Sequence, residues 1–446
     1  MSDYMFMLDS HLTADQSRVA AEVQAKAAEQ GLNLFLSGGA MRDMLGGFPI
    51  RDLDFTVEGS ALKFAKHLAT KSGAEILSTD DHKKSAELLF PNGVTVEIGM
   101  ARTERYGKPG SRPVVAPATM HEDLRGRDFT INAMALSLHK ASRGLLLDPT
   151  NGQADLERKE LRTVHNYAFY DDPLRLLRLL RFKTRLGFAI EERTQMQYTN
   201  AREAEMETKI PVEALNLELR KIADEPDPGE LLRVLEEEKL AHLFSPALAG
   251  AKLNLPTFQR LHKARQMVPS GSEFTAHSLG LFLNVLFEKL NPKERAALVK
   301  RLDLSKAELA AWQKLDANAK KLEKELKAPK LNRASAIYRF LKAQPGELML
   351  YLLLRSQQRL VVDRIKNYFT KYIPIALEVT DRDLLATGIE PGPKFAKAKE
   401  DYINGRLDGR IKKPVPPEPP PTPPQSTGGF ARRSPAATPP PPTTAT

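Results

Sequence analysis

The sequence predicts an α+β protein in which a small head with a mixed β-sheet and helices is followed by all-helical regions. Three observations predict this fold. Short apolar runs separated by turns that contain Gly or Pro fill residues 34–102, as expected for strands. From residue 173 onward, apolar residues recur at helical spacing instead. Residues 414–446 are dominated by Pro, Thr, Ser and Ala, a composition that cannot build a core and predicts disorder.

The length of 446 residues is too great for one ordinary core, so several domains are expected. We place a head, a helical neck, a helical body, a helical tail and a disordered Pro-rich end at residues 1–150, 151–225, 226–330, 331–413 and 414–446. The absence of cysteine excludes a disulfide framework and thiolate metal sites. The net charge of +10 suits a polyanionic partner, although many proteins are mildly basic.

No apolar run is long enough to span a bilayer, so no membrane partner is expected. The first residues carry acids and lack the apolar core of a signal peptide, which makes a cytoplasmic location the expectation. The sequence gives no indication of the oligomeric state.

The head elements are expected in a definite order. We expect a helix, a strand, a helical turn, a strand, a helix, a strand and a hairpin at residues 13–30, 34–36, 40–45, 52–57, 60–72, 74–77 and 86–102. The hairpin turns at Pro91-Asn92-Gly93, which is a strong turn signal.

The strand at residues 52–57 carries two carboxylates. Asp52 and Asp54 are two residues apart, so both project from the same face of the strand while Leu53 points into the core. Two adjacent carboxylates repel each other unless a cation lies between them. Hard oxygen ligands in small number suit Mg²⁺, which takes the rest of its shell from water and substrate phosphates. An Asp-x-Asp alone is more often a solvated strand edge.

Just before that strand, the sequence provides a place for phosphate. Gly38 and Gly39 let the backbone approach a ligand closely, and a helix N-terminus attracts anions. Arg42, one turn further, can reach the same phosphate. A Gly-Gly pair alone is usually only a turn, but the combination describes a nucleotidyl transfer site.

Glu97 is a candidate third carboxylate. In the second strand of the hairpin, Val94, Val96 and Ile98 share one face and Thr95 and Glu97 share the other. The alternative is a strand glutamate that faces solvent, and the sequence does not decide between the two.

The order of these motifs resembles the class II tRNA nucleotidyltransferase (CCA-adding enzyme) and bacterial poly(A) polymerase family. That family has Gly-Gly-x-x-Arg-Asp followed by a strand with Asp-x-Asp. Its later motifs follow at residues 123–133, Asp-Leu-Arg-Gly-Arg-Asp-Phe-Thr-Ile-Asn-Ala, and at residues 171–175, Asp-Asp-Pro-Leu-Arg. One departure is Gly126, which replaces the first Arg of the family's Arg pair.

The resemblance implies roles for the residues of the later motifs. Arg127 would contact the phosphates of the nucleotide, and Asp128 and Asn132 would help to hold its ribose. Asp172 and Arg175 would present an acceptor and a donor to the Watson–Crick edge of the incoming base. Arg178 and Arg181 follow Arg175 at helical spacing in a row of arginines, and the resemblance implies that they contact nucleotide or RNA phosphate.

Two structural alternatives remain open for these motifs. For Arg127 and Asp128 the alternative is an ion pair with each other, and for the Arg row of residues 175–185 it is a solvated helix face. Residues 103–119 are rich in Gly and Pro and indicate a mobile, positively charged loop, which in the family helps to switch nucleotide choice. Residues 379–409 resemble the family's tail segment, which would dock the elbow of a tRNA-like substrate.

The resemblance therefore implies a template-independent enzyme that adds C, C and A to the 3′ end of tRNA from CTP and ATP. Asp52 and Asp54 would hold two Mg²⁺ ions that stabilise the charge of the transferred phosphate. The alternatives within the family are a poly(A) polymerase and an enzyme restricted to A or to CC. Outside it, the alternatives are a non-catalytic RNA-binding protein and a small-molecule nucleotidyltransferase.

Overall fold

The computed structural model describes residues 4–389, 392 and 394–412. Contacts along the chain separate a first compact unit that ends at Leu377 from a second that begins at Glu378. The predicted disorder of residues 414–446 lies outside the described residues. The five-part division expected from the sequence stays a prediction.

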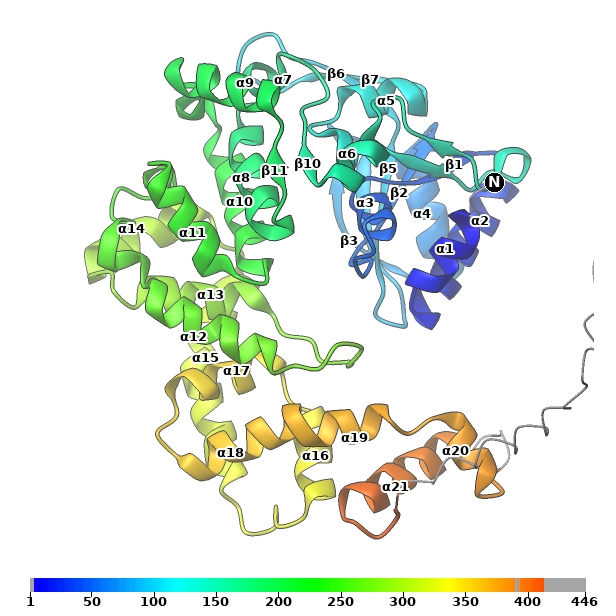
Figure 1. Ribbon diagram of the computed structural model, residues 1–446, viewed down its shortest axis with the longest axis vertical. Coiled ribbons are helices and arrows are strands. Elements are labelled where there is room, and N and C mark those ends of the chain that lie inside the picture. The colour runs from blue at the N-terminus through cyan, green and yellow to red at the C-terminus, as the bar shows by residue number, and fades with distance from the viewer. Residues whose placement is uncertain (1–3, 390–391, 393, 413–446) are drawn as a thin grey trace, which may run out of the picture. The chain divides into compact units, whose positions relative to one another are not determined.

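The first unit contains a seven-stranded sheet in the order β3-β4-β5-β2-β1-β8-β9 (Figure 1). β2 and β5 run parallel, and the other neighbours run antiparallel, so the predicted mixed sheet is confirmed. The strands are β1 Asn33–Ser37, β2 Leu53–Glu58, β3 Glu75–Asp80, β4 Ser85–Leu89, β5 Thr95–Met100, β8 Ala135–Ser137 and β9 Leu146–Leu147.

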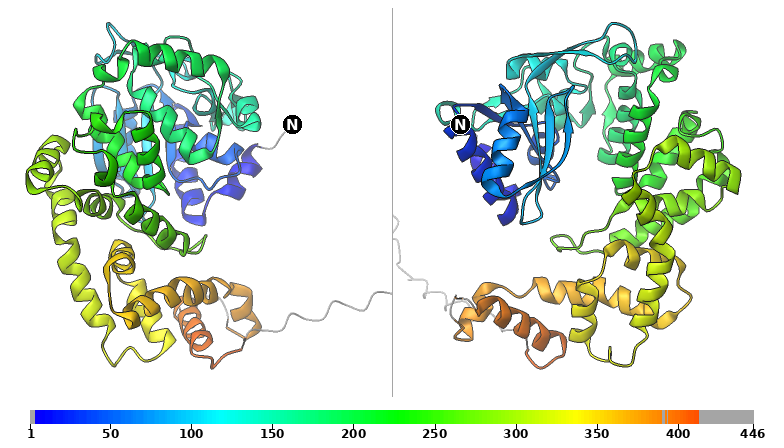
Figure 2. Two further views of the ribbon diagram at one scale, coloured as in Figure 1. Left: turned by 60° about the vertical axis from the view of Figure 1, so that its left-hand side comes forward. Right: turned by 180° about the vertical axis from the view of Figure 1, so that it is seen from behind.

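Helices cover one face of this sheet. α2 packs on β1, and α4 packs on β3, β4 and β5 (Figures 1 and 2). Leu53, Phe55 and Val57 of β2 are buried. Since side chains alternate along a strand, the polar residues between them point to the opposite face. The head helices are α1 Tyr4–His11, α2 Ala14–Glu29, α3 Gly39–Leu45, α4 Ala61–Ser72, α5 Met120–Gly126 and α6 Gly152–Arg158.

Residues 103–119, expected as a mobile, positively charged loop, contain a small antiparallel sheet, so that expectation was wrong at both ends of the segment. β6 Arg102–Arg105 pairs with β7 Val114–Pro117. Val114 and Val115 are β-branched and favour a strand, whereas the Gly and Pro residues that suggested a loop are concentrated in the connection between the strands.

The tip of this connection lies against the backbone of Lys209. Gly110 has a φ of +69°, and a Cβ placed there would lie 2.0 Å from the backbone oxygen of Lys209. Only glycine fits such a close approach without displacing one of the two backbones.

Helices make up the rest of the first unit, apart from a short parallel pair of β10 Glu160–Leu161 and β11 Ala189–Ile190. α8 packs on α10 and α11. The helices are α7 Ala168–Asp171, α8 Leu174–Leu186, α9 Glu192–Glu203, α10 Val212–Asp224, α11 Pro228–Glu237, α12 Leu255–Gln266, α13 Ser278–Phe287, α14 Pro292–Leu302, α15 Lys306–Leu326, α16 Ala334–Lys342, α17 Gly346–Arg355, α18 Arg359–Asn367 and α19 Ile373–Leu377.

The second unit consists of α20 Asp381–Ala386 and α21 Phe395–Leu407. Val379, Leu384 and Tyr402 form its small apolar core. Thr380 begins α20 with a capping box, because its side chain and that of Asp383 bond reciprocally to the backbone.

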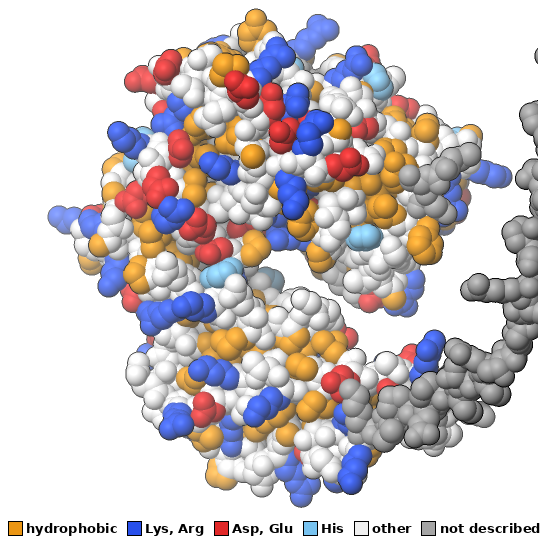
Figure 3. Space-filling view, in the orientation of Figure 1, with side chains coloured by type: hydrophobic (Ala, Val, Ile, Leu, Met, Phe, Trp, Pro, Cys, Tyr) orange, Lys and Arg blue, Asp and Glu red, His pale blue; other side chains and the backbone are white. Residues whose placement is uncertain are grey.

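Within the described part of the chain, no helix is both long enough and apolar enough to cross a membrane. On the face shown in Figure 3, acidic and basic side chains are interspersed.

Candidate active site

Three carboxylates gather where β2, β4 and β5 lie side by side. Asp54 is the register partner of Glu97, and Glu97 is in turn the register partner of Glu87. Residues in register on neighbouring strands project from the same face of a sheet. The three side chains therefore form a row on the face opposite α4.

The environment of Asp54 is that of a carboxyl group short of cations. Burial and, after it, the nearby carboxylates of Glu97 and Asp52 together raise the pKa of Asp54 to about 7, against the opposing effect of Arg127 and Lys221. A cation bound nearby would lower the pKa of Asp54 again, because a positive charge favours the ionised carboxylate.

Among the described residues, no group of three or more His, Asp or Glu side chains is arranged to hold a metal ion by itself. Glu97 as a third ligand therefore stays a prediction, and so does the Asp52–Asp54 pair. A pair of carboxylates still fits Mg²⁺, which often takes only one or two carboxylates from the protein and completes its shell with water and substrate phosphates.

The backbone at Gly38 and Gly39 runs close to Asp54. Gly38 has a φ of +65°, and a Cβ there would lie 3.2 Å from Nη1 of Arg127 and 3.5 Å from Oδ2 of Asp54. A Cβ at Gly39 would lie 3.6 Å from the same oxygen. The two glycines thus keep the space between the carboxylate and the arginines free of side chains.

Arg42, in the helix that begins at these glycines, is buried, and all three of its guanidinium nitrogens donate hydrogen bonds. Its Nε and Nη2 donate to Oδ1 of Asp43 at 2.9 and 2.7 Å, and its Nη1 donates to Oδ1 of Asn132 at 2.8 Å. Asn132 in turn donates to Oδ1 of Asp128 at 3.1 Å. Arg42 and Asn132 therefore hold the glycine turn and the later motif in fixed positions.

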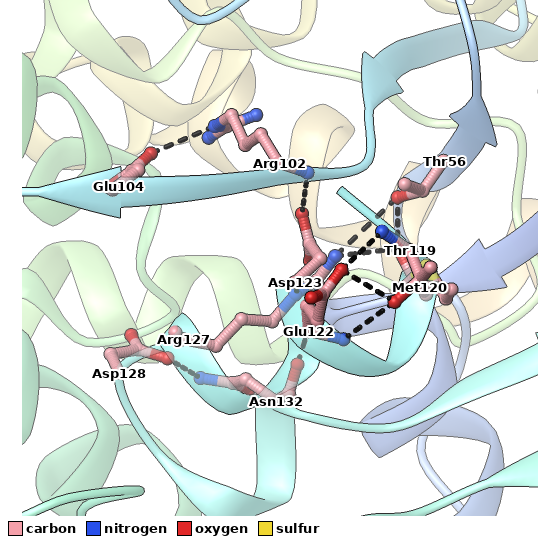
Figure 4. A network of polar contacts seen from close by, with 12 residues as sticks. Thr56, Arg102, Glu104, Thr119, Met120, Glu122, Asp123, Arg127, Asp128 and Asn132 are labelled. Atoms are coloured by element: carbon pink, nitrogen blue, oxygen red, sulfur yellow. Dashed lines mark hydrogen bonds and ion pairs between the residues drawn. The ribbon is translucent and has the colours of Figure 1, made fainter. Parts of the chain in front are cut away.

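Arg127 and Asp128 do not pair with each other, which rules out the simple ion pair considered above. Arg127 donates from Nε to Oδ1 of Asp123 at 2.8 Å, and Asp123 also accepts the backbone N–H of Arg102 (Figure 4). Asp128 pairs with Arg178 of α8. The Arg178 guanidinium, together with Arg175, holds the pKa of Asp128 well below its usual range despite the opposing effect of burial.

The arginine row of α8 is not a solvated face. Arg175 donates from Nη2 to the backbone oxygen of Gly126 at 3.0 Å, and its Nε lies 4.0 Å from Oδ2 of Asp172. Arg181 lies between Glu218 and Glu225, and Arg185 lies 3.3 Å from Oδ2 of Asp43.

An aromatic side chain lies within this row. Three guanidinium groups lie against the ring of Phe182. The distances from its centroid to the guanidinium carbons of Arg42, Arg178 and Arg181 are 5.2, 5.6 and 4.8 Å. The ring also meets Phe129 edge-on at 5.7 Å. α8 is therefore fixed to the head by ion pairs and by an aromatic contact.

Every site residue predicted from the sequence lines one cleft of about 880 Å³, which is large enough for a nucleotide. Head residues from the sheet and the glycine turn form one side, and residues of α8 and α10 form the other. The predicted residues are Gly38, Gly39, Arg42, Asp52, Asp54, Glu97, Arg127, Asp128, Asn132, Asp172, Arg175, Arg178 and Arg181. Their individual roles stay predictions.

The cleft also has lining residues that no sequence motif indicated, among them Lys83, Glu87, Tyr106 and Lys221. The hairpin register through Gly93 could have found Glu87, because it places Glu87 opposite Glu97. Tyr106 donates to Oε2 of Glu104 at 2.7 Å. No sequence signal indicated this residue, because it lies within residues 103–119, which were expected to form a mobile loop.

Comparison with known proteins agrees with the motif pattern. Residues 34–162 match the family model described as the poly A polymerase head domain. An A-adding tRNA nucleotidyltransferase of Halalkalibacterium halodurans is 31% identical over 421 residues, which cover 92% of this chain and 93% of that protein. A CC-adding tRNA nucleotidyltransferase of Deinococcus radiodurans is 29% identical over 410 residues, which cover 90% and 94%.

The fold gives the same result. A solved structure of a CCA-adding enzyme in an apo form matches with a TM-score of 0.54 and 25% identity, over 92% of this chain and 96% of that one. Ordered motifs, a shared cleft and similarity over nearly the whole chain lead to one conclusion: the chain belongs to the class II tRNA nucleotidyltransferase family.

Proposed function

We propose that this tRNA nucleotidyltransferase adds C, C and A to the 3′ end of tRNA from CTP and ATP and releases pyrophosphate. The observation that supports it best is the single cleft, where the Asp52–Asp54 pair, the glycine turn and the Asp172–Arg175 pair lie together. A carboxylate pair suits the reacting phosphate, and a donor–acceptor pair suits the edge of a base.

We propose Mg²⁺ as the cofactor, with Asp52 and Asp54 as its protein ligands. The support is the mutual repulsion of carboxylates around Asp54, which a bound cation would relieve. When bound, the ion would neutralise charge on the transferred phosphate and the leaving pyrophosphate.

The choice of base can be made by two side chains. Cytosine and adenine both present an amino group beside a ring-nitrogen acceptor. Asp172 can accept from the amino group, and Arg175 can donate to the nitrogen. Uracil and guanine present the reverse pattern and would leave these groups unpaired, which is costly for polar groups that binding removes from water.

Addition of the terminal A alone is the second candidate. It is favoured by the similarity to an A-adding enzyme over 92% of this chain. In that case the tRNA would reach the cleft with both C residues already in place. The cytoplasmic location expected from the sequence stays a prediction in either case.

The test is incubation of the purified protein with Mg²⁺, one labelled nucleoside triphosphate at a time and three tRNA transcripts. The transcripts lack the last three nucleotides, lack only the terminal A, or carry the complete CCA. Stepwise addition that stops after the A supports CCA addition. Incorporation of A only, on the transcript that ends in CC, supports the second candidate.

Other outcomes overturn both candidates. Long A tails on varied RNAs would identify a poly(A) polymerase, and no incorporation would leave a non-catalytic RNA-binding protein. Two variants serve as controls. Asp54→Asn should abolish incorporation, whereas Glu97→Gln should raise the Mg²⁺ concentration needed for half-maximal rate if Glu97 acts as a third ligand.

A further inference from the structure

Most of the cations that line the cleft are already paired with carboxylates. Arg42, Arg127, Arg178, Arg181 and Arg185 each have an Asp or Glu oxygen within 3.3 Å. Among the described residues that line the cleft, only Arg51, Lys83 and Lys221 have no carboxylate oxygen within 4.0 Å. These three cations are the ones left free to bind an anionic ligand.

Lys221 lies on the side of α10 that faces the cleft. Leu217, Lys221 and Asp224 recur at i, i+4 and i+7 and line the cleft together, so they share one helix face. Leu219 and Ile222 are buried on the other side of the helix. The ammonium group is thus carried by a helix that is fixed to its neighbours and is exposed toward the site.

The surroundings of Lys221 are short of negative charge. Arg178 is the main cause that lowers the pKa of Lys221, followed by desolvation, and Glu218 only partly offsets them. Lys221 also contributes to lowering the pKa of Asp54, so its field reaches the carboxylates of the head. A strongly anionic ligand between α10 and β2 would relieve the repulsion among these cations.

We propose that Lys221 binds the triphosphate of the incoming nucleotide from the neck side of the cleft, opposite Asp54. This inference rests on the proposed function and assigns to Lys221 a phosphate contact that the resemblance gave to Arg178 and Arg181. Those two arginines instead hold the neck to the head and to α10, because Asp128, Glu218 and Glu225 already occupy them.

The test is equilibrium binding of ATP to the full-length protein in the absence of tRNA, with Mg²⁺ present. Lys221→Met keeps most of the aliphatic side chain and removes the charge. The Kd for ATP should rise about 10- to 100-fold, as expected for loss of a hydrogen bond to a charged group. The Kd for adenosine should not change, because adenosine has no phosphate.

Two further variants make the result specific. Lys221→Arg should restore most of the affinity, because it returns the charge to the same place. Lys183→Met is the matched control, since Lys183 is an exposed residue of α8 that does not line the cleft, and it should bind ATP like the unaltered protein.

A gel-shift measurement of tRNA binding separates the two sources of phosphate. An unchanged Kd for ATP with weaker tRNA binding would overturn the proposal and make Lys221 a contact to the RNA backbone. Unchanged binding of both ligands would also overturn it. Failure of the unaltered protein to bind ATP would instead contradict the proposed function.

Discussion

Replacing Arg181 with methionine should destabilise the first unit rather than weaken nucleotide binding. The Arg181 guanidinium donates from Nε to Oε1 of Glu218 at 2.6 Å and from Nη1 to Oε1 of Glu225 at 3.1 Å. The three side chains are only 6%, 2% and 6% exposed. The substitution would therefore leave two buried carboxylates without their nearest cation.

The magnitude follows from this burial. Removing one partner of a buried ion pair typically lowers the free energy of unfolding by about 3–5 kcal/mol, because an uncompensated charge remains in a region of low dielectric. Arg185 lies 4.0 Å from Oε2 of Glu225 and can compensate part of the loss. We therefore expect the free energy of unfolding to fall by about 3 kcal/mol, a large share of the roughly 5–15 kcal/mol typical of a domain.

The assay is urea unfolding followed by circular dichroism, with hydrogen exchange of the α8 amides as a second probe, since a chain of several domains need not unfold in one step. Glu218→Gln added to Arg181→Met should recover part of the loss, and the double-mutant cycle should show a coupling energy above about 1.5 kcal/mol. A loss below about 1 kcal/mol with a tenfold higher Kd for ATP would refute the reasoning and make Arg181 a phosphate ligand.

Three further predictions follow from other contacts. Arg175→Ala should lose discrimination between ATP and UTP in transfer assays about 10-fold or more, with tRNA binding in gel shifts unchanged, because it removes the donor proposed to read the base. Gly110→Ala should expose the β6–β7 connection to trypsin without changing the main unfolding transition, since its Cβ would clash with the neck backbone. Gly107→Ala, where a Cβ meets nothing within 4 Å, is the matched control. Arg355 is the main cause that lowers the pKa of Glu288 to about 2. The charged form of Glu288 therefore stabilises the fold at pH values above the unfolded-state pKa of about 4.3, and this contribution disappears as the pH falls toward 2. Glu288→Gln should cost roughly 1–2 kcal/mol in urea unfolding at neutral pH and progressively less in acid; a cost that does not depend on pH would contradict this assignment.

The sequence predicted those parts of the fold that depend on local pattern. The hairpin of β4 and β5 was found from alternation and from the turn at Gly93, and it placed Glu97 on the polar face. The glycine turn and the Asp-x-Asp strand were found from spacing. The β6–β7 hairpin was missed because Gly and Pro between its strands outweighed four-residue strands that have little pattern of their own.

The sequence could not predict the partners of the arginines on α8. Helical spacing shows that Arg178 and Arg181 share a face, but Asp128 lies 50 residues before Arg178 and Glu218 lies 37 residues after Arg181. Periodicity within one helix contains no information about such distant partners. The same limit explains why Lys221 was not singled out, since its lack of a partner is visible only once the other cations have found theirs.

The paired arginines also affect how tRNA binding should respond to ionic strength. A cation releases condensed counterions from RNA only if it is free to replace them at the phosphates. Arg178, Arg181 and Arg185 of α8 are already paired with protein carboxylates, so they should contribute little to the slope of log Kd against log salt concentration. The net charge of +10 already counts these carboxylates, but it belongs to the whole chain and does not give the number of cations that are free at the cleft. Shape and directed hydrogen bonds, which salt screens far less, are left to select the RNA end and the nucleotide there.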